Sequence, residues 1–132
     1  MRSAAAVARL PELRTDAWSR EGMDEAGWAT RVQSDAAGNR TLRVSQGQRV
    51  ELFLDPTLAA ACGTYTGHLL DGDVAGPLPA GASLDAQNGI FRWQVAPEFR
   101  GTFHFVFVQR GCDNRERRIP VTAHIGVSPS PK

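Results

Sequence analysis

Phenylalanine at every second position of one short segment constrains the fold of this 132-residue chain more than any other feature. Phe103, Phe105 and Phe107 share one face of an extended strand, because successive side chains of a strand point to opposite sides. Val106 and Val108 fall on the other face. Since both faces are apolar, the strand is predicted to belong to a sheet that is covered on both sides.

Further segments of the chain show the same alternation of apolar and polar residues, separated by turn-forming residues. Including the phenylalanine strand, the predicted strands are residues 41–44, 49–54, 64–70, 90–95, 102–109 and 117–125. Residues 76–81 form a Pro/Gly crossover and not a strand interior. No helical pattern lies between the strands, so we expect an all-β fold, an antiparallel two-sheet β-sandwich.

The texture of the sequence divides the chain into three parts. A turn-rich cluster ends at Asn39, and the sandwich is predicted to occupy residues 39–126. Residues 1–38 are assigned to an N-terminal extension or strap. Residues 127–132 contain two prolines in a Ser-Pro-Ser-Pro run, and we assign them to a C-terminal linker or tail.

The N-terminal extension carries apolar residues at helix-like spacing, which are Val7, Leu10, Leu13, Ala17 and Trp18. Pro11 is expected to interrupt or open any helix there, because proline lacks a backbone N–H. Two interpretations are open: a short helix or irregular tail inherited from a neighbouring domain, or a strap over one sheet. The strap would cover the face of the phenylalanine strand that lies outside the sandwich core, with Trp18 or Trp28 as its anchor.

The composition argues against two classes of partner. The formal net charge is +1 and charged residues make up 22% of the chain, so no strong overall field attracts nucleic acid or an anionic membrane. No apolar run approaches the roughly 18 residues of a membrane span, and the first residues contain no signal-peptide hydrophobic region. We therefore expect no nucleic acid, no membrane insertion, and an export signal outside this fragment.

Three motifs occur in order along the second half of the chain: Leu-Pro-Ala-Gly-Ala-Ser-Leu-Asp at 78–85, Gly-Ile-Phe-Arg-Trp at 89–93 and Gly-Thr-Phe-His-Phe at 101–105. They resemble the signature of bacterial Ig-like and dystroglycan-type cadherin-like domains. Ala82 stands where leucine is common, and residues 94–97 are longer than the usual connection. The resemblance implies an Ig-like or cadherin-like sandwich on the cell surface or secreted, in a family of spacers, adhesion modules and carbohydrate-binding neighbours.

The two cysteines are candidates for a disulfide. Cys62 lies just before the third predicted strand, and Cys112 lies between the fifth and sixth. In an Ig-like topology these B–C and F–G loops emerge at the same end of the sandwich, and an oxidising compartment favours a bond. The alternative is two free thiols in separate loops. No CxxC spacing supports a catalytic role.

The loop between the last two predicted strands is rich in arginine, with Arg110, Arg115, Arg117 and Arg118 beside Asp113 and Glu116. This cluster could bind an anionic glycan or a protein partner. A solvated loop whose opposite charges partly neutralise one another is the competing interpretation, and we favour it.

Metal sites are weakly indicated. Asp71 and Asp73 offer oxygen ligands of the kind that calcium uses, but Asp-Gly-Asp is also an ordinary turn. His104 and His124 are expected to point outward from adjacent strands, where two imidazoles could hold a metal if a third ligand were present. None is evident, so we predict no metal and no cofactor, with calcium as the minor alternative.

No catalytic motif is recognisable in the sequence, and we predict a non-enzymatic structural or spacer module of a multidomain bacterial protein. Its partners would be neighbouring domains of the same parent chain. The alternative is a ligand-binding or adhesion module, for a glycan or a protein, at the B–C and F–G loop pole. Exposed Trp18, Trp28 or Tyr65 would favour glycan binding, whereas Trp93 is expected in the core. If the N-terminal segment packs on another copy of the chain, the doubly apolar strand would also allow self-association by strand addition.

Overall fold

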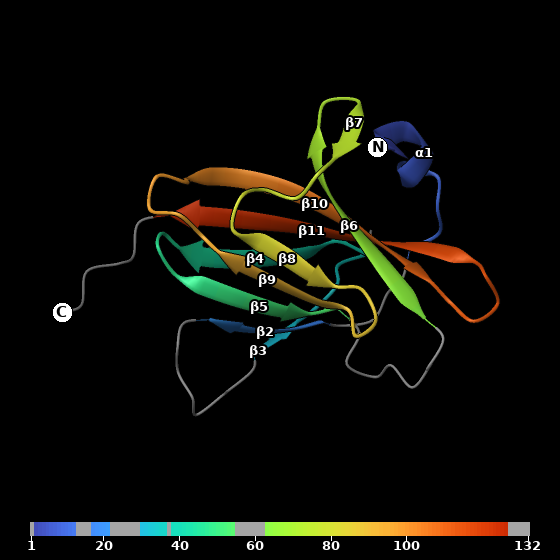
Figure 1. Cartoon of the computed structure of the whole chain (residues 1–132), viewed down its shortest axis with the longest axis horizontal. Coiled ribbons are helices and arrows are strands. Elements are labelled where there is room, and N and C mark those ends of the chain that lie inside the picture. The colour runs from blue at the N-terminus through green and yellow to red at the C-terminus, as the bar shows by residue number, and fades with distance from the viewer. Residues whose placement is uncertain (1, 13–16, 22–29, 37, 55–62, 127–132) are drawn as a thin grey trace.

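Two β-sheets pack face to face in the computed structural model, which describes residues 2–12, 17–21, 30–36, 38–54 and 63–126 (Figure 1). Sheet A contains, in spatial order, β1 (Arg2–Ser3), β7 (Val74–Gly76), β6 (Thr64–Asp71), β10 (Gly101–Arg110), β11 (Glu116–Gly126) and β4 (Arg40–Ser45). Sheet B contains β3 (Thr30–Val32), β2 (Ala17–Glu21), β5 (Arg49–Phe53), β9 (Ile90–Gln94) and β8 (Ala82–Asp85). One short helix, α1 (Ala4–Ala8), lies beside sheet A.

The strand order is that of an Ig-like sandwich. In sheet B, β2-β5-β9-β8 follow the A-B-E-D order, and in sheet A β6-β10-β11 follow the C-F-G order. The predicted all-β two-sheet sandwich is therefore confirmed. Each of the predicted strands is present with ends within one residue of the prediction.

The expectation of purely antiparallel sheets is wrong at one edge. Strand β4 pairs with β11 in parallel, with Leu42 opposite Ala123, while β5 lies in the other sheet. The chain thus crosses between the sheets at residues 46–48. Alternation of apolar residues is the same in parallel and antiparallel pairs, so the sequence pattern does not distinguish them. Arg40, at the start of β4, is buried and its Nη1 donates a hydrogen bond to the Gly38 carbonyl over 2.9 Å.

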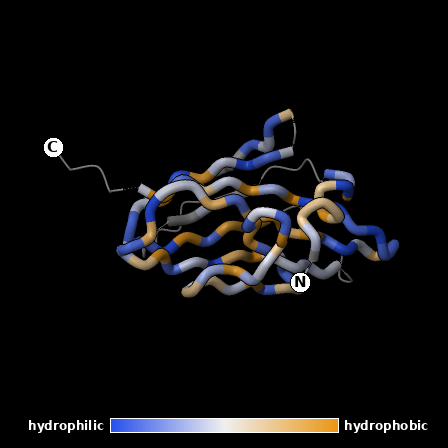
Figure 2. Tube along the Cα trace, turned by 90° about the horizontal axis from the view of Figure 1, so that it is seen from above, coloured by the Kyte–Doolittle hydropathy of each residue, from blue (hydrophilic) through white to orange (hydrophobic). Residues whose placement is uncertain are grey.

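The core lies between the sheets and is dominated by aromatic rings. The ring centroids of Phe91 and Phe107 are 5.1 Å apart, and those of Trp93 and Phe105 are 5.4 Å apart. Hydrophobic and hydrophilic residues alternate along the strands in Figure 2, as half-buried sheets require. Trp93 is buried as predicted. Tyr65 is also buried, so it is no exposed platform for a glycan.

Two turn glycines are tied to this core. Gly89 has φ +67°, and a Cβ added there would lie 2.7 Å from the Tyr65 ring. Gly81 has φ +84°, and a Cβ there would lie 2.6 Å from the Gln94 carbonyl oxygen. Both the left-handed backbone and the close approach require glycine, which explains the glycines in two of the motifs.

The second apolar face of β10 is covered by the N-terminal segment. Val106 and Val108 form a small buried cluster with Val7 of α1 and Ala75 of β7, and Leu10 packs against it. Residues 2–12 therefore form a strap, one of the two interpretations, with Val7 and Leu10 as its anchors. The predicted start of the sandwich at residue 39 is wrong, because β2 and β3 of the assigned extension are strands of sheet B. The expectation of Trp18 is wrong, because Trp18 lies in β2 of the opposite sheet. Trp28 lies outside the described residues, as does the C-terminal tail.

Candidate functional site

The arginine-rich hairpin between β10 and β11 pairs its own charges. Asn114 adopts a positive φ of 66° in the turn of this hairpin. Arg110 contacts Glu116 over 3.3 Å, and Asp113 lies 3.8 Å from Arg115 and 3.7 Å from Arg117. The interpretation of a partly self-neutralised loop fits this geometry better than a convergent anion site.

The pKa of the Asp113 carboxyl is lowered, first because it accepts a hydrogen bond from the Arg115 backbone N–H over 3.0 Å. The positive charges of Arg117 and Arg115 lower it further. Asp113 is therefore a turn-forming residue whose charge is used within the hairpin.

Arg118, the fourth arginine of the predicted cluster, holds the strap in place. Its Nε donates to the Leu10 carbonyl over 2.9 Å, and its backbone N–H donates to the Pro11 carbonyl over 2.8 Å. Its Nη2 donates to Glu12 over 2.5 Å. At the other end of the strap, β1 pairs with β7 and the Ala4 N–H donates to the Asp73 carbonyl. These contacts assign Arg118 to the fold.

Cys112 lies exposed in the hairpin turn, and no free thiol occurs in the described part of the chain. Its expected partner, Cys62, lies outside the described residues. The disulfide between them therefore stays a prediction.

The weak metal candidates do not converge. Asp71 and Asp73 lie exposed on either side of Gly72 in the β6–β7 turn, and the described residues contain no group of three or more His, Cys, Asp or Glu side chains that could hold a metal. Asp85 instead caps its own turn: its carboxylate accepts hydrogen bonds from Asn88 Nδ2 over 2.8 Å and from the Asn88 and Gln87 N–H groups. The Asn88 hydrogen bonds lower the pKa of Asp85.

His104 and His124 do point outward from adjacent strands, and threonine hydroxyls hold both rings. Thr102 faces His124 across the β10–β11 pair, and its Oγ1 lies 3.1 Å from His124 Nδ1. Thr122 faces His104, with 3.3 Å between Oγ1 and Nδ1. Because the Thr122 hydroxyl donates to Asn39 Oδ1 over 3.2 Å, it is left to accept from His104 Nδ1.

These side chains belong to the half of the outer face of sheet A that α1 leaves uncovered. Strand β4 extends it, since Arg43 lies opposite His124 and Thr41 lies opposite Thr122. Arg100 immediately precedes β10 at the same end. We call this surface, consisting of Thr41, Arg43, Arg100, Thr102, His104, Thr122 and His124, the polar face.

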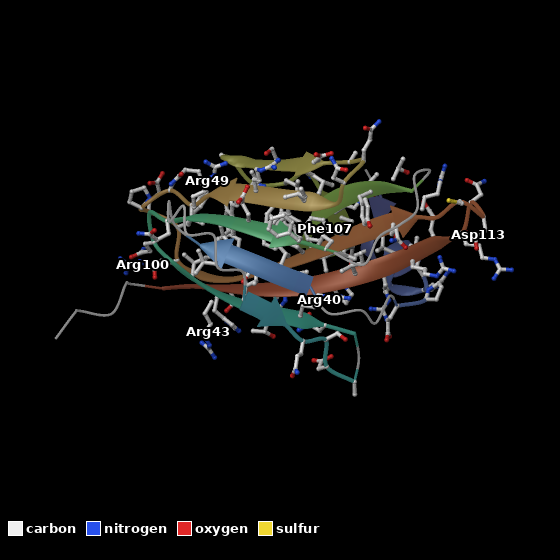
Figure 3. The ribbon with its side chains drawn as sticks, turned by 90° about the horizontal axis from the view of Figure 1, so that it is seen from below. Arg40, Arg43, Arg49, Arg100, Phe107 and Asp113 are labelled. Atoms are coloured by element: carbon white, nitrogen blue, oxygen red, sulfur yellow. The ribbon has the colours of Figure 1, made fainter. Side chains whose placement is uncertain are left out.

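The charges of the polar face differ from those of the hairpin. Arg43 and Arg100 are both exposed, and neither makes an ion pair with another described residue. Figure 3 shows them at the same end of the molecule, with Asp113 at the opposite end. No carboxylate occurs at the outward positions of the three strand segments that form the face. Of the residues of this face, the two histidines are candidates from the sequence, whereas the two arginines are not.

A shallow hollow of about 360 Å³ lies at the edge of sheet A and is lined by Gly67, His68, Ala75, Gly76 and Pro77. His68 Nε2 lies 3.3 Å from Thr66 Oγ1. The lining of this hollow is mainly apolar and contains a single ionisable side chain, so the hollow offers no paired acid and base.

No helix in the described part of the chain has the length and hydrophobicity needed to cross a membrane.

The chain matches no protein-family model, and no curated protein matches it in sequence. Among solved structures, it is similar to a candidate alpha-galactosidase from Bacteroides fragilis, with 13% identity and a TM-score of 0.49 over 89% of this chain and 19% of that one. The extracellular domain of a candidate hybrid two-component system from B. thetaiotaomicron gives 14% identity and a TM-score of 0.48, over 93% of this chain and 16% of that one.

A further similar structure is a nucleoside hydrolase-related hypothetical protein from Saccharophagus degradans, described as associated with carbohydrate metabolism. It gives 17% identity and a TM-score of 0.47, over 64% of this chain and 22% of that one. The chain thus spans less than a quarter of the length of each of these proteins.

Proposed function

We propose that this chain is a non-enzymatic structural module of a multidomain bacterial surface or secreted protein. The observation that carries the proposal is the use of polar side chains within the fold. Arg118 and Glu12 hold the strap, while Arg110, Arg115 and Arg117 pair with acids of their own hairpin. Residues used in this way stabilise the module and present no convergent chemistry at the hairpin.

The architecture supports the same role. Cover on both sides of β10 gives the module two apolar layers, of which the inner one is rich in aromatic rings. The described chain starts beside β7 and ends where β11 ends, at the far left of Figure 1. Separate points of entry and exit suit a unit connected in series with neighbouring domains.

The full 132-residue chain provides the test. We expect a monomer that unfolds in one cooperative thermal transition, because the strap and the sandwich share strand pairs. We also expect no hydrolysis of chromogenic glycosides or esters above that of the heat-denatured chain. Turnover by the folded chain would contradict the proposal, and so would a chain that unfolds unless a second domain is supplied.

A binding or adhesion module is the second candidate, and one observation favours it. The polar face is exposed, and its two arginines make no ion pair with described residues, unlike the hairpin at the predicted loop pole. If the module binds a ligand, we therefore expect the ligand at the polar face.

A further inference from the structure

We infer that the polar face binds an anionic polysaccharide whose charges are carboxylate or sulfate groups. This goes beyond the structural role, because a module that connects domains does not require a ligand. Four features carry the inference: the composition of the face, its separation from acidic groups, the hydrogen bonds that hold its rings, and its boundary with the strap.

The composition combines a few positive charges with many neutral hydrogen-bonding groups. Thr102, His124 and Arg43 form one row across β10, β11 and β4, and His104, Thr122 and Thr41 form the next. Outward residues of one strand are about 7 Å apart, and neighbouring strands are about 4.8 Å apart. The face therefore offers a closely spaced array of hydroxyl and imidazole groups, with guanidinium groups at one end.

The charge of the face is not cancelled locally. Of the carboxylates near its strands in sequence, Asp35 and Glu98 lie in connections outside the strands, and Glu116 of β11 pairs with Arg110 at the hairpin end. Asp35 accepts a hydrogen bond from the Asn39 backbone N–H over 2.9 Å. Exposed Arg43 and Arg100 can each present a planar pair of donors to a carboxylate or sulfate, which is the geometry that guanidinium groups suit best.

The imidazole rings are held before a ligand arrives. His104 and His124 each use Nδ1 toward a threonine, which leaves Nε2 of each ring for another partner. The Thr122 hydroxyl is itself oriented by Asn39, whose Nδ2 donates to Thr41 over 3.4 Å. Side chains that are already oriented lose less conformational entropy on binding.

The composition of the polar face disfavours nucleic acid and protein as partners. Nucleic acid binding relies on many phosphate contacts or on stacking by large aromatic rings, and this face offers two arginines and no outward Phe, Tyr or Trp side chain. A protein interface needs an apolar centre, which the strap has covered at Val106 and Val108. A polysaccharide presents hydroxyls along its length with a charge on only some sugars, and this matches the face.

The experiment measures binding of the full chain to three immobilised polymers: polygalacturonate for carboxylates, dextran sulfate for sulfates, and neutral dextran. We expect binding to at least one charged polymer and none to dextran, and the two charged polymers decide between carboxylate and sulfate. In the Arg43→Gln/Arg100→Gln variant, we expect affinity to fall at least about tenfold, since two charge-assisted contacts are removed.

The matched control is Arg110→Gln/Arg115→Gln, which removes the same charge from the hairpin end of the same strands. It should keep the wild-type affinity. Thr122→Val, which changes no charge, should weaken binding by releasing the His104 ring. Both double-arginine variants should remain folded with thermal transitions close to that of the wild type, because all four arginines are exposed and surface ion pairs contribute about 1 kcal/mol or less.

Three results would overturn the inference. The first is no binding to either charged polymer at low salt. The second is an equal loss in both double-arginine variants, which would indicate overall charge and not this face. The third is duplex DNA binding as tightly as the polysaccharide and depending on Arg43 and Arg100, which would assign the face to nucleic acid.

Discussion

Both faces of sheet A carry apolar side chains that must be buried, but the amount of apolar surface differs between the two faces. On the inner face, Phe103, Phe105 and Phe107 need a whole second sheet to cover them. On the outer face, Val106 and Val108 are covered by a five-residue helix and the segment after it. The size of the side chains on each face therefore determines how much chain is needed to bury them.

The outer face is also divided along its length. Its centre is closed by the strap, the hairpin end carries arginines paired with acids, and the opposite end carries arginines without such partners among the described residues. Residues with similar chemistry thus have different roles at the two ends of β10 and β11. The difference lies in what the fold places beside them.

The largest loss of folding stability is expected from a substitution on the inner face of sheet A. Phe107 is fully buried, and its ring contacts that of Phe91. Phe107→Ala should destabilise the fold by about 3 to 5 kcal/mol, the usual cost of a large aromatic truncation in a core. Chemical denaturation measures this, with Phe107→Leu as a control that leaves a smaller cavity and a smaller loss. A loss below that of Val108→Ala would contradict the difference between the faces.

The next largest effect on folding stability is expected from removal of the predicted disulfide. In the β6–β10 pair, Thr64 lies opposite Arg110, and Cys112 follows Arg110 by two residues. Closing a loop of about 50 residues would stabilise the fold by roughly 3 to 4 kcal/mol in the chain-entropy model. Cys112→Ser should lower the unfolding temperature to that of the reduced wild type. If a reducing agent leaves the wild type unchanged, the cysteines are not bonded.

The strands were predictable because alternation and turn residues are local properties of the sequence. Residues 64–70 and 102–109 were placed correctly since each carries its own pattern. The short strand β7 has only three residues, and β2 lies in a segment whose apolar spacing resembled a helix. Neither strand contains enough residues to show the period-two alternation that identifies a strand. Both are held in extended conformation by pairing with neighbouring strands.

The polar face could not be predicted for a different reason. It joins β4 to β11, which are about eighty residues apart, through a parallel register that no local pattern reveals. The hairpin arginines were predicted as a candidate binding cluster because they are close together in sequence. Their adjacency to Asp113 and Glu116 is also what neutralises them. The hairpin arginines were therefore predicted as a candidate site because they are close in sequence, although their charges are paired. The residues of the polar face are far apart in sequence and were not predicted as a site.

A smaller effect should appear at the strap. Val7 is buried against Val106 and Val108, so Val7→Ala removes two methyl groups from this cluster and should cost about 1 to 2 kcal/mol. Hydrogen exchange should accelerate in β7 and the strap, while β9 and the inner half of the core stay protected. Ala8→Ser, at an exposed position of the same helix, is the control. Equal acceleration in both sheets would show that the strap and the core open together.

The smallest effect is expected at the hairpin end, as a dependence of stability on pH. The hydrogen bond from the Arg115 N–H, with the charges of Arg117 and Arg115, lowers the pKa of the Asp113 carboxyl below its usual value. A lowered folded-state pKa stabilises the fold above the unfolded value, and this contribution is lost as the pH falls through the folded-state pKa. Asp113→Asn should therefore be less stable than wild type at neutral pH.

The two proteins should approach the same stability in strong acid, because protonation removes the charge of Asp113 in the wild type. Thermal unfolding across this pH range measures the difference. High salt should reduce the part due to Arg117 and leave the part due to the turn hydrogen bond. A difference between the two proteins that does not change with pH would show that Asn disturbs the turn itself, and the charge of Asp113 would then contribute nothing to the hairpin end.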